Sequence, residues 1–231
     1  MDQQILYKFQ MKRFEVFKAQ DSENDHFDVI FEINGKKLYA NTFMLCPIST
    51  TFKSMLSDRW TKRDETIPIQ DYTFDDFKEF LTFIYSGKCA LTNENVFALI
   101  DMAEFYGVPE FKEACEKFSL NIIDTDNALK IHEYAFKYSM AQLKKSINIF
   151  IAKNLSNLIN SEKLQTLQKS AVKDIIESIN KMSKQEELFE IIFNWAQIQA
   201  TEKQKLEPNL NLNEAIKEEL IDFLPFIKYE K

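Results

Sequence analysis

Residues 27–45, FDVIFEINGKKLYANTFML, place apolar side chains at every second position and then change to helical spacing. A period of two is typical of a half-buried strand. Asn34 and Gly35 follow, and this pair readily adopts the positive φ angles of a two-residue type I′ turn. The segment therefore predicts a β-hairpin that leads into a helix. The inward side chains of its first strand are Val29, Phe31 and Ile33.

Residues 41–72 predict two short helices and one further strand. Pro47 interrupts the apolar spacing, and because proline breaks a helix, two short helices with a break between them are expected. A short strand is expected within TKRDETIPIQDY, and Pro68 assigns it to a sheet edge because proline cannot donate a ladder hydrogen bond. The apolar positions of the two helices are Phe43, Leu45, Phe52, Met55 and Leu56.

Helical signals dominate from Thr73 onward. Thr73 is a candidate N-cap with Asp76 at the capping-box position, and Gly87 ends that helix. Thr92 and Gly107 bound the next helix in the same way. The apolar stripes of these two helices are Phe74, Phe77, Leu81 and Ile84, and then Val96, Leu99, Ala103 and Tyr106.

The second half of the chain predicts one helix after another. Leu164 and Leu167 begin one of them, and a capping box at Ser183 and Glu186 precedes another. The polar segment TEKQKLEPNLNLN predicts a loop before the last helix. A mixed α+β unit is therefore expected first and an all-helical unit second, with the boundary near residues 121–125.

Upstream of the hairpin, residues 13–17 (RFEVF) alternate apolar and polar side chains and predict a strand. The acidic polar stretch DSENDH then predicts a connection. An exposed strand on a small domain invites pairing with another chain.

Composition narrows the possible functions. A net charge of −7 gives no reason to expect nucleic acid or an anionic membrane as a partner. Three widely spaced cysteines form neither a disulfide framework nor a zinc motif, and indicate a reduced protein of the cytosol or nucleus. No apolar run approaches the ~18 residues that span a bilayer, and the first residues lack the apolar core of a secretory signal.

Catalytic chemistry is not expected. The three glycines, at positions 35, 87 and 107, allow no phosphate-binding loop, and the sequence predicts no cofactor and no metal site. His26 and His132 have no paired nucleophile or ligand set. Asp75 with Asp76 is explained by helix capping and dipole effects. Cys46 has no electropositive neighbour that would activate its thiol.

The order of these elements resembles a BTB/POZ domain followed by a BACK domain. The resemblance to BTB rests on the hairpin with Asp28 ahead of it, Ala40 at the helix entry, and Ser49 with Phe52. It continues through FLTFIYSG, LTNENV and AEFYGVPEFKEAC. The resemblance to BACK rests on DNALKIHEYAFKYSMAQLKKSINIFIAKNL, EELFEIIFNW and IDFLPFIKY. The implied division is an N-terminal extension at 1–26, a BTB/POZ domain at 27–120 and a BACK-like domain at 121–231.

The resemblance implies an α+β dimerisation module and an all-helical arm, which together commonly act as the adaptor of a cullin-3 ubiquitin ligase. The expected partners are a second copy of the chain, a cullin-3-type scaffold and an unknown protein substrate. A BTB scaffold that does not bind cullin is the alternative. The 26 residues before the hairpin are too few for a separate substrate domain. Three alternatives are therefore expected: the substrate binds the BACK surface, the chain is a fragment of a longer protein, or the protein only dimerises and docks.

Two positions depart from the family pattern. Asn41 stands where the family commonly has His after the helix-entry Ala, so altered local polar contacts within a preserved fold are expected. Lys62 stands where an apolar-x-Glu motif for cullin binding has its carboxylate, which weakens or redirects docking. Trp60 supplies the apolar anchor of that motif, or alternatively packs on its own domain.

These considerations give two sets of candidate residues. The N-terminal strand of a BTB domain often pairs with the partner subunit, which points to a dimer interface near it. The dimer candidates are Phe14, Val16, Phe17, Phe43 and Leu45. The candidates for the cullin-binding face are Trp60, Thr61, Lys62, Tyr106, Ala128, Ile131 and His132.

Overall fold

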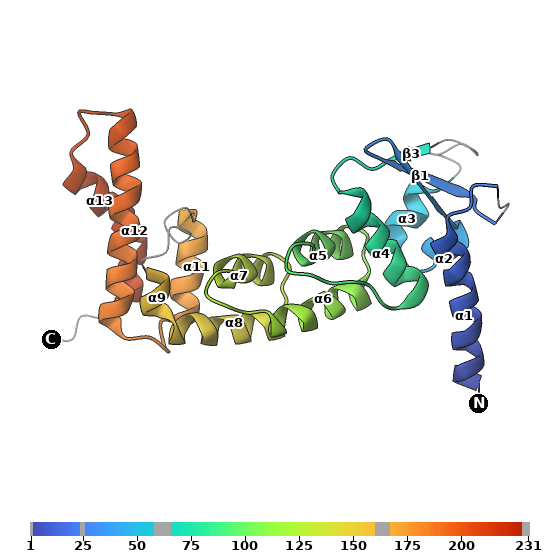
Figure 1. Cartoon of the computed structure of the whole chain (residues 1–231). Coiled ribbons are helices and arrows are strands. Elements are labelled where there is room, and N and C mark those ends of the chain that lie inside the picture. The colour runs from blue at the N-terminus through green and yellow to red at the C-terminus, as the bar shows by residue number, and fades with distance from the viewer. Residues whose placement is uncertain (1, 24–25, 58–65, 160–166, 228–231) are drawn as a thin grey trace. The chain divides into compact units, whose positions relative to one another are not determined.

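The computed structural model describes residues 2–23, 26–57, 66–159 and 167–227. The chain divides into two compact units, Met1–Phe118 and Ser119–Lys231 (Figure 1). The first unit combines a small sheet with helices, and the described part of the second unit is helical. The α+β fold class followed by an all-α region is confirmed.

The hairpin forms as predicted. Strands β1 (Val29–Ile33) and β2 (Lys36–Ala40) pair antiparallel, and Asn34 and Gly35 between them have φ angles of 50° and 75°. Strand β3 (Thr66–Pro68) pairs parallel with β1, so the sheet order is β2-β1-β3 and the proline-containing strand lies at an edge. The inward residues of β1 are buried in the core of the unit.

The described helices that come next after the hairpin are α2 (Thr42–Leu45), α3 (Thr50–Met55), α4 (Phe74–Ser86), α5 (Val96–Phe105) and α6 (Pro109–Asn121). Thr73 caps α4, because its hydroxyl accepts a hydrogen bond from the Asp76 N–H, and Gly87 ends the helix with φ 73°. Thr92 and Asn95 bond each other reciprocally ahead of α5. Phe52, Phe77, Phe80 and Tyr106 form a buried aromatic cluster.

The predicted N-terminal strand is wrong. Residues 13–17 lie inside an 18-residue helix, α1 (Asp2–Ala19), which packs on α4. Gln10 and Phe17 both contact Tyr85 of α4, and they lie seven positions apart, which is two helical turns. No Gly or Pro interrupts this helix, so a five-residue alternation was too short to identify a strand.

The described helices of the second unit are α7 (Ala128–Lys137), α8 (Ala141–Lys153), α9 (Leu155–Ile159), α11 (Lys169–Ile179), α12 (Gln185–Leu206), α13 (Leu212–Leu220) and the 3₁₀ helix η1 (Ile221–Phe226). Among these and the described helices of the first unit, none is long and apolar enough to cross a bilayer.

Two local predictions for the second unit are wrong. The predicted loop at residues 201–213 is helical up to Leu206 and again from Leu212, and Lys203 in this extension of α12 pairs with Glu219 of α13. Ser183 does not cap α12, which begins at Gln185, and the Ser183 hydroxyl has no hydrogen-bond partner. Leu164 lies outside the described residues, and Leu167 lies just before α11 rather than within a helix.

Candidate interaction surfaces

The predicted dimer residues separate into core and surface. Phe17 is buried and its ring stacks on Tyr85 with centroids 4.2 Å apart, and Leu45 is also buried within its own unit. Phe14 and Val16 are half-buried, and Phe43 is 70% exposed. Phe17 and Leu45 are therefore core residues of the first unit, and Phe43 is the one of these five predicted residues that exposes most of its ring to another molecule.

Sequence reasoning missed a group of exposed apolar side chains on the first unit. Residues 3–9 of α1 are all exposed, and this end of the helix extends away from the sheet (Figure 1). We call its large apolar residues together with Phe43 the α1 surface: Ile5, Leu6, Tyr7, Phe9 and Phe43. The spacing of Ile5 and Phe9 by four was the available signal, because such residues share one helix face.

A pocket of about 360 Å³ adjoins the α1 surface. Its apolar lining comes from Val16, Phe43 and Met44, and its polar lining includes Asn41. The Arg13 guanidinium lies 5.7 Å from the centre of the Phe43 ring. Lys12, Arg13 and His26 add basic groups to the pocket.

A polar network holds the start of α2 beneath Phe43. The Tyr85 hydroxyl donates to the Asn41 Oδ1 and accepts from the Asn41 N–H, both at 2.8 Å. The Asn41 amide also donates to the His26 carbonyl. Asp28 accepts a hydrogen bond of 2.7 Å from the Thr42 N–H. Burial raises the pKa of Tyr85, so its hydroxyl stays protonated and available as a donor.

Four of the seven predicted cullin-binding residues are buried, and the other three are not described. Trp60, Thr61 and Lys62 lie outside the described residues. Tyr106 is buried, with its ring 4.3 Å from that of Phe52. The remaining candidates, Ala128, Ile131 and His132, are also buried. Tyr106, Ala128 and Ile131 are therefore core positions of their own units, and His132 is buried but lines a pocket.

The neighbour of Tyr106 in the sequence is an exposed aromatic residue. Phe105 is 59% exposed at the end of α5, and its ring lies edge-on to Tyr106 at 4.9 Å. The Thr51 hydroxyl of α3 donates to the Phe105 carbonyl at 3.0 Å, and the Ser49 hydroxyl donates to the Tyr106 carbonyl. The backbone beneath Phe105 is thus held by α3, which keeps an exposed aromatic ring in a defined place.

The described part of the chain shows no metal-binding cluster and no activated thiol or histidine. No cluster of three or more His, Cys, Asp or Glu side chains there is arranged to hold a metal ion. The three cysteines are free, and burial raises the pKa of each thiol, to about 12 for Cys89. Burial and the nearby Lys144 lower the pKa of His132 to about 4, so its ring is neutral near pH 7.

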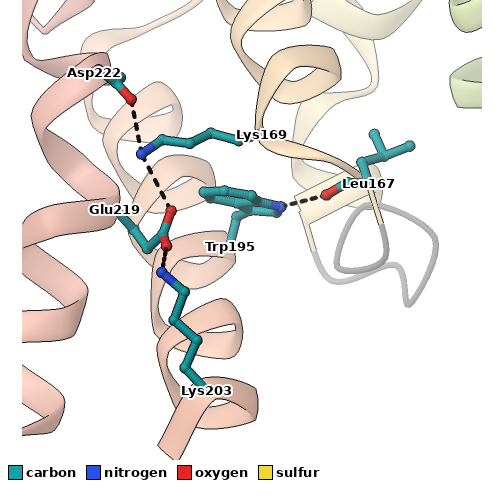
Figure 2. A network of polar contacts seen from close by, with 6 residues as sticks. All are labelled: Leu167, Lys169, Trp195, Lys203, Glu219 and Asp222. Carbon is teal, nitrogen blue, oxygen red and sulfur yellow. Dashed lines mark hydrogen bonds and ion pairs between the residues drawn. The ribbon is translucent and has the colours of Figure 1, made fainter. Parts of the chain in front are cut away.

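An ionic network joins four helical elements of the second unit (Figure 2). The buried Glu219 of α13 binds Lys169 of α11 at 3.3 Å and also Lys203 of α12. Lys169 binds Asp222 of η1 at 2.8 Å. Beside the network, the Trp195 indole N–H donates to the Leu167 carbonyl at 3.0 Å.

Residues 17–123 match the family model described as BTB/POZ domain, and residues 128–221 match the one described as BTB And C-terminal Kelch, abbreviated BACK. The human protein named BTB/POZ domain-containing protein 9 is 27% identical over 173 residues, which are 73% of this chain and 28% of that protein. Kelch-like protein 24a of Danio rerio is 25% identical over 170 residues, with the same two coverages. The chain thus spans under a third of the length of these relatives.

Solved structures were similar to the first half of the chain. The BTB domain of zebrafish PATZ1 aligns with a TM-score of 0.41 and 20% identity, covering 48% of this chain and 91% of that one. The BTB domain of human Gigaxonin aligns with a TM-score of 0.39 and 15% identity, covering 47% and 91%.

Proposed function

Because this chain belongs to the family of proteins in which a BTB/POZ domain is followed by a BACK domain, we propose that it is a homodimeric, non-enzymatic adaptor that brings a protein substrate to a cullin-3 ubiquitin ligase. Its family is one of interaction modules, and one of its relatives is named as a Kelch-like protein. In this proposal one surface binds a second copy, another binds the cullin, and dimerisation doubles both sites. The free thiols suit a reducing compartment, so we place it in the cytosol or nucleus.

The α1 surface carries the proposal of a dimer. The first turns of α1 expose Ile5, Leu6, Tyr7 and Phe9 without contacts from their own unit to cover them. A helix end that packs on nothing is marginal in water, and several exposed large apolar side chains on it favour contact with another chain. We therefore infer that α1, within the predicted arm at residues 1–26, acts as the dimer arm, and that Leu6, Phe9 and Phe43 contact the second copy.

Light scattering coupled to size-exclusion chromatography tests the dimer. Wild type is expected to run as a dimer at micromolar concentration, and Leu6→Asp combined with Phe9→Asp is expected to run as a folded monomer. Gln4→Asp, which adds a charge to an exposed position of the same helix, serves as the matched control and is expected to remain dimeric. A monomeric wild type would refute the dimer.

Phe105 supports the proposal of cullin binding, together with the sequence candidate Trp60. An exposed aromatic ring on a held backbone is typical of an interface hot spot. Phe105→Ala and Trp60→Ala are each expected to weaken binding to purified cullin-3 by roughly 30-fold, equivalent to about 2 kcal/mol. Leu206→Ala, at an exposed apolar position of the second unit, is the control and should bind normally. Lack of binding by wild type would reject the adaptor function.

A scaffold that does not bind cullin is the second candidate, and Lys62 favours it. A lysine at that position places a positive charge where related cullin-binding domains carry a carboxylate. If wild type fails to bind cullin-3 while Lys62→Glu binds, this charge accounts for the difference and the scaffold function is supported. Strong binding by wild type that Lys62→Glu leaves unchanged would remove the argument for it.

A further inference from the structure

The second unit contains a pocket of about 380 Å³ between α7 and α11, which we call the α7–α11 pocket. One wall comes from α7 and the other from the first turns of α11 and the two residues before it. Its apolar lining consists of Phe136, Leu167 and Ala171. Its polar lining consists of His132, Glu133, Lys137, Gln168, Ser170 and Asp174.

His132 is the one lining residue whose polar atom is buried without a partner. It is 2% exposed, and its Nε2 has no hydrogen-bond partner. A buried polar atom left unpaired costs about 1–3 kcal/mol, so such an atom in the wall of a pocket indicates a missing partner. With its proton on Nε2, the neutral ring of this lining residue has one hydrogen-bond donor without an acceptor.

The amino-terminal end of α11 offers further donors. Gln168 is the N-cap with an extended backbone (φ −67°, ψ 151°), and its side chain accepts no capping hydrogen bond. The first backbone bond of the helix runs from the Val172 N–H to the Gln168 carbonyl, at 3.1 Å. The N–H groups of Ser170 and Ala171 precede it and have no intrahelical acceptor. Such a helix end attracts negative charge.

The fixed charges around the pocket are balanced. The carboxylates are Glu133, Asp174 and Glu177, and the ammonium groups are Lys137, Lys144 and Lys173. Lys144 acts on both His132 and Asp174. Because these side chains offset one another, the unpaired donors and the helix end decide which ligand charge is favoured. An acceptor with negative charge satisfies them, and a cation does not.

We propose that the α7–α11 pocket binds an acidic side chain of a partner protein. The carboxylate accepts hydrogen bonds from the first-turn amides of α11 and from His132, and an apolar residue beside it packs on Phe136 and Leu167. This site lies among described residues of the second unit and is separate from Phe105 and the α1 surface. It does not depend on cullin binding, so either proposal can fail without the other.

NMR titration of the full chain with the peptide acetyl-Leu-Glu-Leu-amide tests the proposal. We expect saturable shifts of the Ser170 and Ala171 amides, and a rise in the pKa of His132 when the carboxylate is bound. Acetyl-Leu-Gln-Leu-amide is expected to bind at least tenfold more weakly, because it cannot form charge-assisted hydrogen bonds. Equal binding of the two peptides, preferential binding of acetyl-Leu-Arg-Leu-amide, or no shift with any peptide would overturn the proposal.

A variant that fills the site from within separates loss of binding from loss of folding. Gln168→Asp places an intramolecular carboxylate at the N-cap of α11, so it is expected to abolish peptide binding while stabilising the second unit. Lys184→Asp makes the same kind of cap on α12, which also lacks a side-chain cap, and is the matched control. The control should keep full peptide affinity. If Gln168→Asp binds the peptide as wild type does, the α11 amides are not the site.

Discussion

Replacing Glu219 by Gln keeps the shape of the side chain and removes its charge from the network of Figure 2. The Glu219 side chain is 9% exposed, and it binds two lysines from two other helices. The variant therefore tests whether the charge holds α11 and α12 to α13. We expect Glu219→Gln to lower the free energy of unfolding of the second unit.

The magnitude follows from opposing contributions. Across the 3.3 Å between Lys169 Nζ and Glu219 Oε2, Coulomb attraction is roughly 5 kcal/mol at an effective dielectric constant of about 20. The cost of burying the carboxylate offsets most of this attraction. Lys203 is half-exposed, and solvent screening reduces its contribution. We expect a net loss of about 1–2 kcal/mol, which lowers Tm by roughly 2–8 °C.

The pH dependence has a definite sign. Burial alone would raise the pKa of Glu219, but hydrogen bonds from Lys203 and Lys169 outweigh it and lower the pKa below its ordinary value of 4.5. A lowered pKa in the folded state contributes stability that is complete above the ordinary value and is lost as the pH falls through the folded-state value. The difference in stability between wild type and Glu219→Gln should therefore shrink below pH 4.5.

Urea unfolding monitored by Trp195 fluorescence measures this difference, since the indole lies beside the network. Glu218→Gln is the matched control, because it makes the same chemical change at the exposed neighbouring position. Equal midpoints for the two variants at neutral pH, or a difference that grows on acidification, would refute the reasoning.

Three further predictions concern the first unit. Tyr85→Phe should lower its stability by about 1–3 kcal/mol in urea unfolding by leaving two polar partners unpaired, whereas Tyr7→Phe, at an exposed position, should leave it unchanged; equal effects would contradict this. Gly87→Ala should cost about 1–2 kcal/mol because its φ is 73° in open space, and Gly87→Asn should cost less; the reverse order would exclude backbone strain as the cause. Alkylation at pH 7 followed by mass spectrometry should show modification of half-buried Cys46 before buried Cys115. Both thiols should react faster as the pH rises, because burial raises the pKa of each. A Cys115 that reacts readily at neutral pH would be inconsistent with its burial.

Residues 13–17, which were predicted to be a strand, illustrate how a local pattern misleads when it covers few residues. In RFEVF, Phe14 and Val16 lie two positions apart, as on one face of a strand. Phe14 and Phe17 lie three positions apart, as on one face of a helix, and their rings do contact each other. The helix is stabilised by Tyr85, which lies far away in the chain. This contact joins residues far apart in the chain, so the five-residue pattern does not contain it.

The predicted cullin-binding residues show the same difference between what the sequence indicates and what packing decides. Tyr106, Ala128, Ile131 and His132 were chosen by family position, although the apolar spacing of its helix already placed Tyr106 on the inward face, and all four are buried. Phe105, one position away, is the exposed ring. A shift of one residue turns a helix by about 100°, enough to exchange core and surface.

By itself the sequence determined the elements whose signals are local and the order in which they occur. The positive φ angles at Asn34 and Gly35 specify the hairpin, and the cap at Thr73 and stop at Gly87 specify a helix, because each depends on backbone conformation and hydrogen bonds within a few residues. The tertiary structure alone decided that the first residues are a helix, that Phe17 is core while Phe43 is surface, and that His132 lines a pocket with an unpaired nitrogen. These outcomes depend on packing between segments far apart in the chain, which local periodicity does not encode.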